Sequence, residues 1–68
     1  MNVQSIAFPK HDWTLYEMES WLARHGYHPM KAEETVSFVR FRIRSPNVRG
    51  VYATKVLPNG IRLIMMKT

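Results

Sequence analysis

The chain has no cysteine among its 68 residues, which excludes a disulfide framework and a thiolate metal site. It has no apolar segment near the ~20 residues that a membrane helix needs, so we expect no membrane partner. Its first dozen residues lack the basic start and apolar run of a signal peptide, which favours a cytoplasmic location. A chain of this length has no room for a second domain, so residues 1–68 are predicted to form one small domain.

Acidic residues are few, and none lies in the second half of the chain. Residues 1–34 carry three basic and five acidic side chains, a net charge of −2, whereas residues 35–68 carry seven basic and no acidic ones, a net charge of +7. This asymmetry favours a polyanion or an acidic protein surface as the partner. The alternative is that folding brings the acidic half against the basic half and cancels much of the field.

One helix is predicted over residues 14–25. Thr14 and Glu17 form a capping-box pattern, in which each side chain accepts a hydrogen bond from a backbone N–H at the helix start. Gly26 supplies a residue suited to the left-handed conformation that ends a helix, and Pro29 follows it. The apolar side recurs at helical spacing and comprises Leu15, Met18, Trp21, Leu22 and His25.

The second half of the chain is typical of strands. Segments 35–44, 50–57 and 61–67 are rich in β-branched, aromatic and other apolar residues, and turn residues separate them. The segment NVQSIAF ahead of Pro9 adds an optional short edge strand. We therefore expect an α+β fold, with one helix packed on a three- to four-stranded antiparallel sheet in the order (β)-α-β-β-β.

Alternation in segment 35–44 divides its side chains between the two faces of the sheet. Val39, Phe41 and Ile43 are predicted to face the helix. A single helix covers one face, so the opposite face is left to water or to a partner. That uncovered face is predicted to carry a row formed by Phe38, Arg40, Arg42 and Arg44.

The arginine row predicts a binding surface. Side chains two residues apart in a strand repeat at about 6.6 to 6.8 Å, a spacing that suits successive phosphates of a nucleic acid. An aromatic ring at the end of the row can stack on a base. The alternative is an ordinary solvated face whose charges prevent aggregation. The candidate nucleic-acid or partner-binding residues are Phe38, Arg40, Arg42, Arg44, Arg49, Lys55 and Arg62.

The sequence does not favour catalysis, a metal ion or a cofactor. His25 and His28 are three residues apart, but Gly26 breaks the helix between them and removes the geometry of a shared metal site. Glu33 and Glu34 are expected to lie in a solvated loop. No glycine-rich phosphate loop and no trio of acid, base and nucleophile is recognisable, so we expect a protein that is not an enzyme.

The order of several short motifs resembles a module common in bacteriophage and prophage genes. Over about Trp13 to Ile64 the chain has the family's pattern of motifs: Trp13-Thr14, Trp21-Leu22, His25-Gly26-Tyr27, Val39-Arg40-Phe41-Arg42, Pro46, Thr54-Lys55-Val56-Leu57 and Gly60-Ile61. It departs from the pattern at Ile43, where the family often has a polar residue, and at Leu57-Pro58-Asn59, where a family glycine is usual. Members are mostly of unassigned function, and some occur near head-morphogenesis genes. The resemblance implies a viral protein of the host cytoplasm.

Three kinds of partner follow from these patterns. The first is a nucleic-acid backbone, bound by a phage-type accessory protein with strong salt dependence and weak sequence preference. The second is an acidic host protein surface, bound by a phage-encoded inhibitor of the anti-CRISPR or host-takeover type that has no enzymatic activity. The third is a second copy of the chain, because small sheets with an open face often complete their burial by forming a homodimer.

Overall fold

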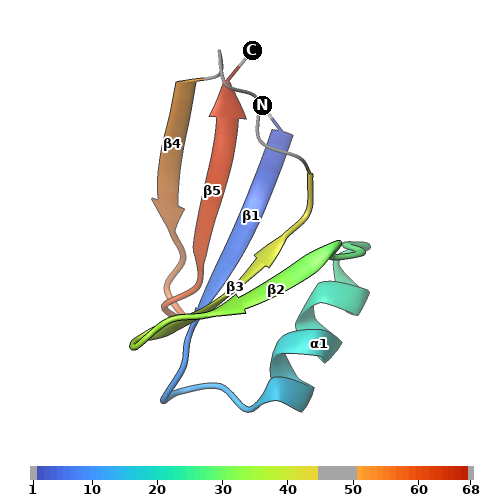
Figure 1. Ribbon diagram of the computed structural model, residues 1–68, viewed down its shortest axis with the longest axis vertical. Coiled ribbons are helices and arrows are strands. Elements are labelled where there is room, and N and C mark those ends of the chain that lie inside the picture. The colour runs from blue at the N-terminus through green and yellow to red at the C-terminus, as the bar shows by residue number, and fades with distance from the viewer. Residues whose placement is uncertain (1, 45–50, 68) are drawn as a thin grey trace.

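The computed structural model describes residues 2–44 and 51–67. Within these residues the chain forms five strands and one helix, in the order β1-α1-β2-β3-β4-β5 (Figure 1). Their bounds are β1 Asn2–Pro9, α1 Leu15–Arg24, β2 Lys31–Glu34, β3 Phe38–Arg42, β4 Val51–Val56 and β5 Arg62–Lys67. All neighbouring strands are antiparallel, and the sheet order is β2-β3-β1-β5-β4.

The predicted sheet of three to four strands in the order (β)-α-β-β-β is wrong, because the described residues form a five-stranded sheet. The first difference is β1, which is the central strand and pairs with both β3 and β5 rather than lying at an edge. Its side chains suit that place: Ile6 and Phe8 are fully buried on the helix side, while the small Ser5 and Ala7 are buried on the other. The central position of β1, with a paired strand on each side, therefore accounts for the burial of these four residues.

The second difference is β2, which contains the two glutamates that were predicted to lie in a loop. Its sequence, KAEE, has no β-branched or aromatic residue, so its own preference for strand is weak. Pairing with β3 sets its conformation, with Glu33 opposite Arg40 and Lys31 opposite Arg42. The opposite charges of Glu33 and Arg40 favour this pairing, whereas the like charges of Lys31 and Arg42 oppose it. The electrostatic gain therefore comes from Glu33, which contacts both arginines.

The helix begins and ends as predicted. Thr14 is its N-cap: its hydroxyl accepts from the Glu17 backbone N–H at 3.2 Å, and its own N–H donates to the Glu17 carboxylate at 2.9 Å. These hydrogen bonds, the one from the Thr14 backbone foremost, lower the pKa of Glu17. At the other end His25 is the C-cap, and Gly26 has a φ of 76°. No helix among the described residues is long and apolar enough to cross a membrane.

The core lies between α1 and one face of the sheet. Its fully buried centre is the Phe8 ring, which meets Trp13, Trp21 and Phe41 edge-on at centroid distances of 5.3, 5.7 and 5.6 Å. Figure 1 shows α1 beside the β2–β3 end of the sheet, away from β4. As predicted, β3 turns Phe41 into the core, with Val39 and Ile43 packed against it. The opposite face of the sheet, called the open face below, has no helix on it in the described chain.

The turn between β4 and β5 gives a test of local packing. Gly60 has a φ of +87°, and a Cβ placed on it would lie 3.0 Å from the Cγ atom of Pro9. Gly26 has a φ of +76°, but a Cβ there would meet nothing within 4 Å. We expect Gly60→Ala to lower the free energy of unfolding by about 2 kcal/mol and Gly26→Ala by about 1 kcal/mol, measured by urea denaturation. Equal losses would show that Pro9 moves aside without cost.

Candidate functional site

The open face is assembled from the five strands in a defined register. On β1 it presents Ser5 and Ala7, which lie opposite Arg42 and Arg40 of β3. On the other side of β1, Ala7 lies opposite Arg62 of β5. Directly paired residues in a sheet share a face, so this register places Arg40, Arg42 and Arg62 together. The prediction that Arg40 and Arg42 face away from the helix is confirmed.

The side chains that β1 presents on the open face are small. The exposed fractions of Ser5 and Ala7 are only 2% and 6%, since longer side chains from β3 and β5 rise on either side of them. Around Ala7 the open face has a cavity of about 300 Å³, called the Ala7 hollow below. The hollow is lined by Ala7, Thr35, Phe38, Arg40, Thr54, Arg62 and Ile64.

Glu33 contacts both arginines of β3. Its two carboxylate oxygens accept from Arg40 Nη2 at 2.9 Å and from Arg42 Nη2 at 3.3 Å. All three side chains are partly exposed, at 36% for Glu33, 43% for Arg40 and 33% for Arg42. The acidic half of the chain thus meets the basic half at this point, and again where Glu34 pairs with Lys10 at 3.2 Å. The cancellation that the sequence left open as an alternative is therefore realised in part.

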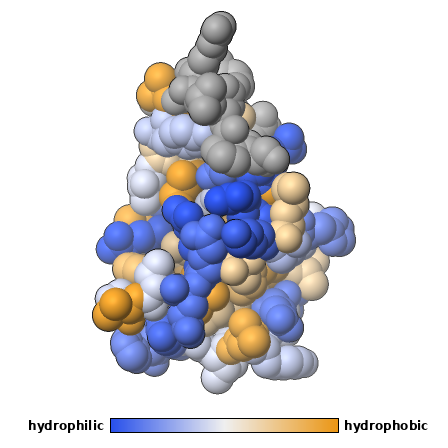
Figure 2. Space-filling model, viewed as in Figure 1, coloured by the Kyte–Doolittle hydropathy of each residue, from blue (hydrophilic) through white to orange (hydrophobic). Residues whose placement is uncertain are grey.

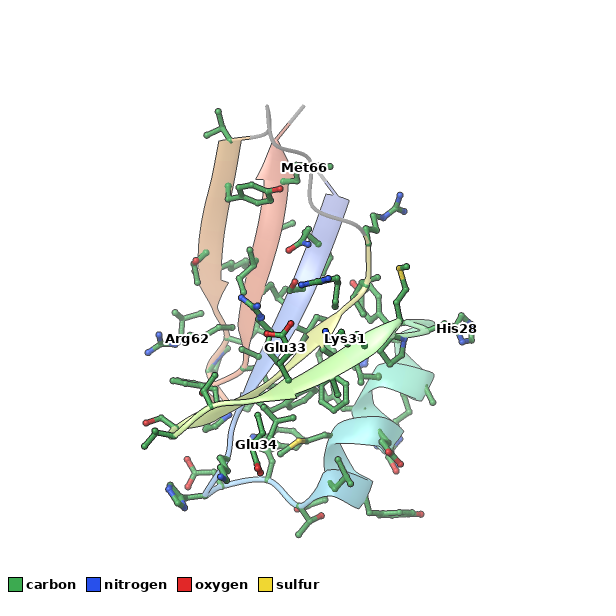
Figure 3. The ribbon with its side chains drawn as sticks, viewed as in Figure 1. His28, Lys31, Glu33, Glu34, Arg62 and Met66 are labelled. Carbon is green, nitrogen blue, oxygen red and sulfur yellow. The ribbon has the colours of Figure 1, made fainter. Side chains whose placement is uncertain are left out.

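The open face keeps an excess of positive charge despite Glu33. Lys31 pairs with Arg42 across the β2–β3 ladder and so shares its face. Among the described residues of β1, β2, β3 and β5 on this face, four cations therefore accompany one carboxylate. Figure 3 shows Lys31 and Glu33 on β2, two residues apart, with Arg62 across the sheet. Figure 2 shows hydrophilic side chains gathered over the middle of the same view.

Arg62 lies over the ring of Phe38, with its Cζ atom 4.6 Å from the ring centroid. Such cation–π contact between neighbouring side chains holds both in place at about 0.5–1 kcal/mol where water reaches them. Phe38 comes from β3 and Arg62 from β5, so the contact spans β1 beside the Ala7 hollow. An aromatic plane, a guanidinium plane and a concave apolar floor meet at this point.

The other predicted site residues lie elsewhere. Lys55 is paired with Leu63, which packs against the core, so Lys55 lies on the helix side of the sheet. Arg44 is exposed and lies past the end of β3, where the N–H groups of Ile43 and Arg44 both donate to the Gln4 carbonyl, at 2.8 and 3.1 Å. Two residues opposite one is the pattern of a β-bulge. Strict alternation stops there, so the register does not extend the row to Arg44. Arg49 lies outside the described residues.

Sequence reasoning missed Lys31, Glu33 and the small floor residues Ser5 and Ala7. Glu33 was expected in a loop and Lys31 was not among the candidate residues, and only the pairing of β2 with β3 brings both to the open face. Ser5 and Ala7 have no charged or aromatic group that would mark them as binding residues. They matter because β1 is the central strand and places them in the middle of the open face. The segment SIAF alternates small residues with large apolar ones. This alternation was the one signal in the sequence that could have indicated a strand with small side chains on one face.

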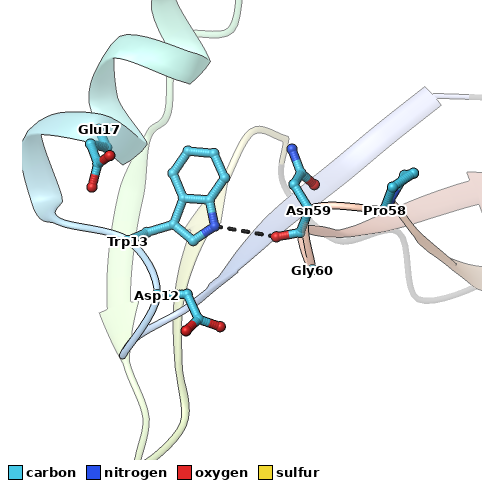
Figure 4. Close-up of a pocket in the computed structure, with 6 residues that line it drawn as sticks. All are labelled: Asp12, Trp13, Glu17, Pro58, Asn59 and Gly60. Atoms are coloured by element: carbon cyan, nitrogen blue, oxygen red, sulfur yellow. Dashed lines mark hydrogen bonds between the residues drawn. The ribbon is translucent and has the colours of Figure 1, made fainter.

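A second cavity lies between the start of the helix and the β4–β5 turn (Figure 4). It has a volume of about 450 Å³ and is lined by Asp12, Trp13, Glu17, Pro58, Asn59 and Gly60. The Trp13 indole N–H donates to the Asn59 carbonyl at 3.4 Å, which ties the turn to the helix start. Within residues 2–44 and 51–67, no three His, Asp or Glu side chains come together as a metal ion requires. We assign this cavity a structural role.

Comparison of the chain with protein-family models, with curated proteins and with solved structures gives no match. The resemblance to a bacteriophage module stays a prediction. The surface chemistry of the open face is therefore the basis for a functional conclusion.

Proposed function

We propose that this protein binds nucleic acid through the open face of its sheet, with Lys31, Arg40, Arg42 and Arg62 contacting backbone phosphates. The observation that carries the proposal is the gathering of four cations around a buried floor of small residues. Phosphate contacts supply most of the affinity of such surfaces and little sequence preference. In keeping with the resemblance to phage modules, we assign the protein an accessory role without enzymatic activity.

Arg40 and Arg42 are held in an orientation that leaves N–H donors available for a phosphate group. A guanidinium carries five N–H donors in a planar fork, more than one carboxylate oxygen can use. Glu33 contacts Arg40 and Arg42 through a single nitrogen of each and so aligns the two side chains. Because both guanidinium groups remain partly exposed, they can accept an incoming phosphate. Less side-chain freedom is then lost on binding.

Glu33 also opposes the proposed ligand, since its charge repels phosphate. We expect Glu33→Gln to raise the affinity for a fluorescein-labelled oligonucleotide by about 2- to 5-fold, the effect of one partly exposed charge pair. The measurement is a fluorescence-anisotropy titration at low salt. The matched control is Glu34→Gln, which removes the same charge from the helix side of β2, where Glu34 pairs with Lys10. The glutamine carbonyl oxygen can still accept from an arginine, so the lost negative charge should outweigh the lost alignment. A drop in affinity for Glu33→Gln, with an unchanged circular dichroism spectrum, would contradict the proposal.

A further inference from the structure

The Ala7 hollow is placed to receive a flat group. Its floor is the Ala7 methyl, and Arg40 and Arg62 stand directly opposite Ala7 on the two neighbouring strands. Its wall includes the Phe38 ring, over which the Arg62 guanidinium already lies at 4.6 Å. Nucleobases stack on aromatic rings and on arginine planes alike, and the stacking tolerates any base because every base has a π-face.

The shape of the hollow selects between paired and unpaired nucleic acid. In a duplex the bases are stacked on one another, and proteins reach their edges by pushing a helix or a β-ribbon into a groove. The Ala7 hollow is concave, so it cannot enter a groove. An unpaired strand can turn a base out of its stack and place it in a cavity.

The charges around the hollow fit the backbone of the same strand. Arg40 borders the hollow, and Arg42 and Lys31 continue from it along the ladder between β2 and β3. Side chains two residues apart on a strand are separated by about 6.6 to 6.8 Å, so Arg40 and Arg42 can contact neighbouring phosphates. Thr54, on the far wall, adds a hydroxyl within the hollow that can hydrogen-bond to a base edge.

We infer that the ligand of the open face is single-stranded nucleic acid, and that one unstacked base enters the Ala7 hollow and stacks on the Phe38–Arg62 pair. This inference rests on the proposed function, because it takes phosphate contact by Arg40 and Arg42 as given. It adds an aromatic contact that the charge of the face does not require. Stacking and charge therefore make separable contributions to binding.

The test compares two variants on labelled oligothymidine and on a labelled duplex of equal length. Phe38→Leu keeps an apolar side chain and removes the aromatic plane, so we expect the affinity for oligothymidine to fall about 5- to 100-fold with an unchanged salt slope. Arg40→Gln keeps the ring and removes a cation, so we expect the slope of log K against log salt to become shallower by about 0.7. The control is Val36→Ala, because Val36 is 88% exposed and lies outside the hollow. The unmodified protein should prefer oligothymidine to the duplex.

Each outcome separates the inference from the proposed function. If Phe38→Leu binds oligothymidine as tightly as the unmodified protein, base stacking in the hollow is overturned while phosphate contact stands. Equal affinity for duplex and single strand overturns the selection of unpaired ligands. If no probe binds at low salt, the proposed function itself fails. Should Phe38→Leu not fold, Thr54→Leu fills the hollow from β4 instead, and the same loss of affinity is expected.

Discussion

Phe8→Ala is expected to abolish cooperative folding of the domain at room temperature. The Phe8 ring is fully buried and contacts three aromatic side chains, one each from the loop before α1, from α1 and from β3. Truncation of a buried phenylalanine costs about 3–5 kcal/mol. A domain of this size has a total stability of only roughly 3–10 kcal/mol, so the loss takes most of it. The measurements are tryptophan fluorescence and far-ultraviolet circular dichroism during urea denaturation.

The control for this prediction is Val36→Ala. Val36 is 88% exposed in the segment between β2 and β3, and its truncation is expected to change the free energy of unfolding by less than about 0.5 kcal/mol. A Phe8→Ala variant that unfolds cooperatively with nearly the midpoint of the unmodified protein would show that the core is not centred on this ring.

The second large effect is expected from removal of the three arginines of the open face. The variant Arg40→Gln, Arg42→Gln and Arg62→Gln loses three charge-assisted contacts, each worth about 1.5 kcal/mol or more. We therefore expect its affinity for oligothymidine at low salt to fall by at least about 100-fold. The salt slope should become shallower by about 2, because about 0.7 is lost with each phosphate contact to a single strand. Fluorescence anisotropy measures both quantities.

A charge-matched control distinguishes binding at the open face from electrostatic attraction by the net charge of the protein. Lys10, Arg24 and Lys55 lie off the open face: Lys10 pairs with Glu34, Arg24 is in the last turn of α1, and Lys55 is on the helix side of β4. Their joint replacement by glutamine removes the same total charge. We expect that variant to keep most of the affinity. Equal losses in the two triple variants would mean that net charge, rather than the open face, attracts the ligand.

Local patterns were sufficient to predict some elements of the fold and insufficient for others. The helix was predicted correctly because its signals are local: Thr14 and Glu17 cap each other within one turn, and Gly26 ends the helix by its own conformation. The prediction that Val39 and Arg40 lie on opposite faces of the sheet was also correct, because it depends only on alternation within a single strand. Such features do not depend on which segments pair.

The errors came from pairing between distant segments. The N-terminal segment was predicted to be an edge strand, but β1 lies between β3 and β5. The sequence of β1 alone does not indicate which strands pair with it. β2 becomes a strand because β3 lies beside it, despite weak local preference. Without β2 on the sheet, the position of Glu33 between Arg40 and Arg42 was not accessible to sequence reasoning.

For a related reason, the sequence did not determine on which face of the sheet Lys55 and Arg62 lie. The face of Arg62 depends on the β1–β5 register, which places it opposite Ala7. The face of Lys55 depends on the register across the β4–β5 turn, where the Leu57 N–H donates to the Ile61 carbonyl at 2.8 Å. That register places Val56 opposite Arg62 and Lys55 opposite Leu63, so the two cations fall on different faces. Arg62 reaches Phe38, and Lys55 leaves the predicted site. A shift of the β4–β5 register by one residue would have placed Lys55 on the open face together with Arg62.

The most direct test of the central claim is a fluorescence-anisotropy titration of oligothymidine and of a duplex, at about 50 and 200 mM salt. Three to four phosphate contacts by the open face predict that the affinity for the single strand falls about 20- to 50-fold between the two salt concentrations. The duplex should bind more weakly at both. Absence of binding to either probe at the lower salt would contradict the account. The open face would then be a surface for an acidic protein or a solvated face.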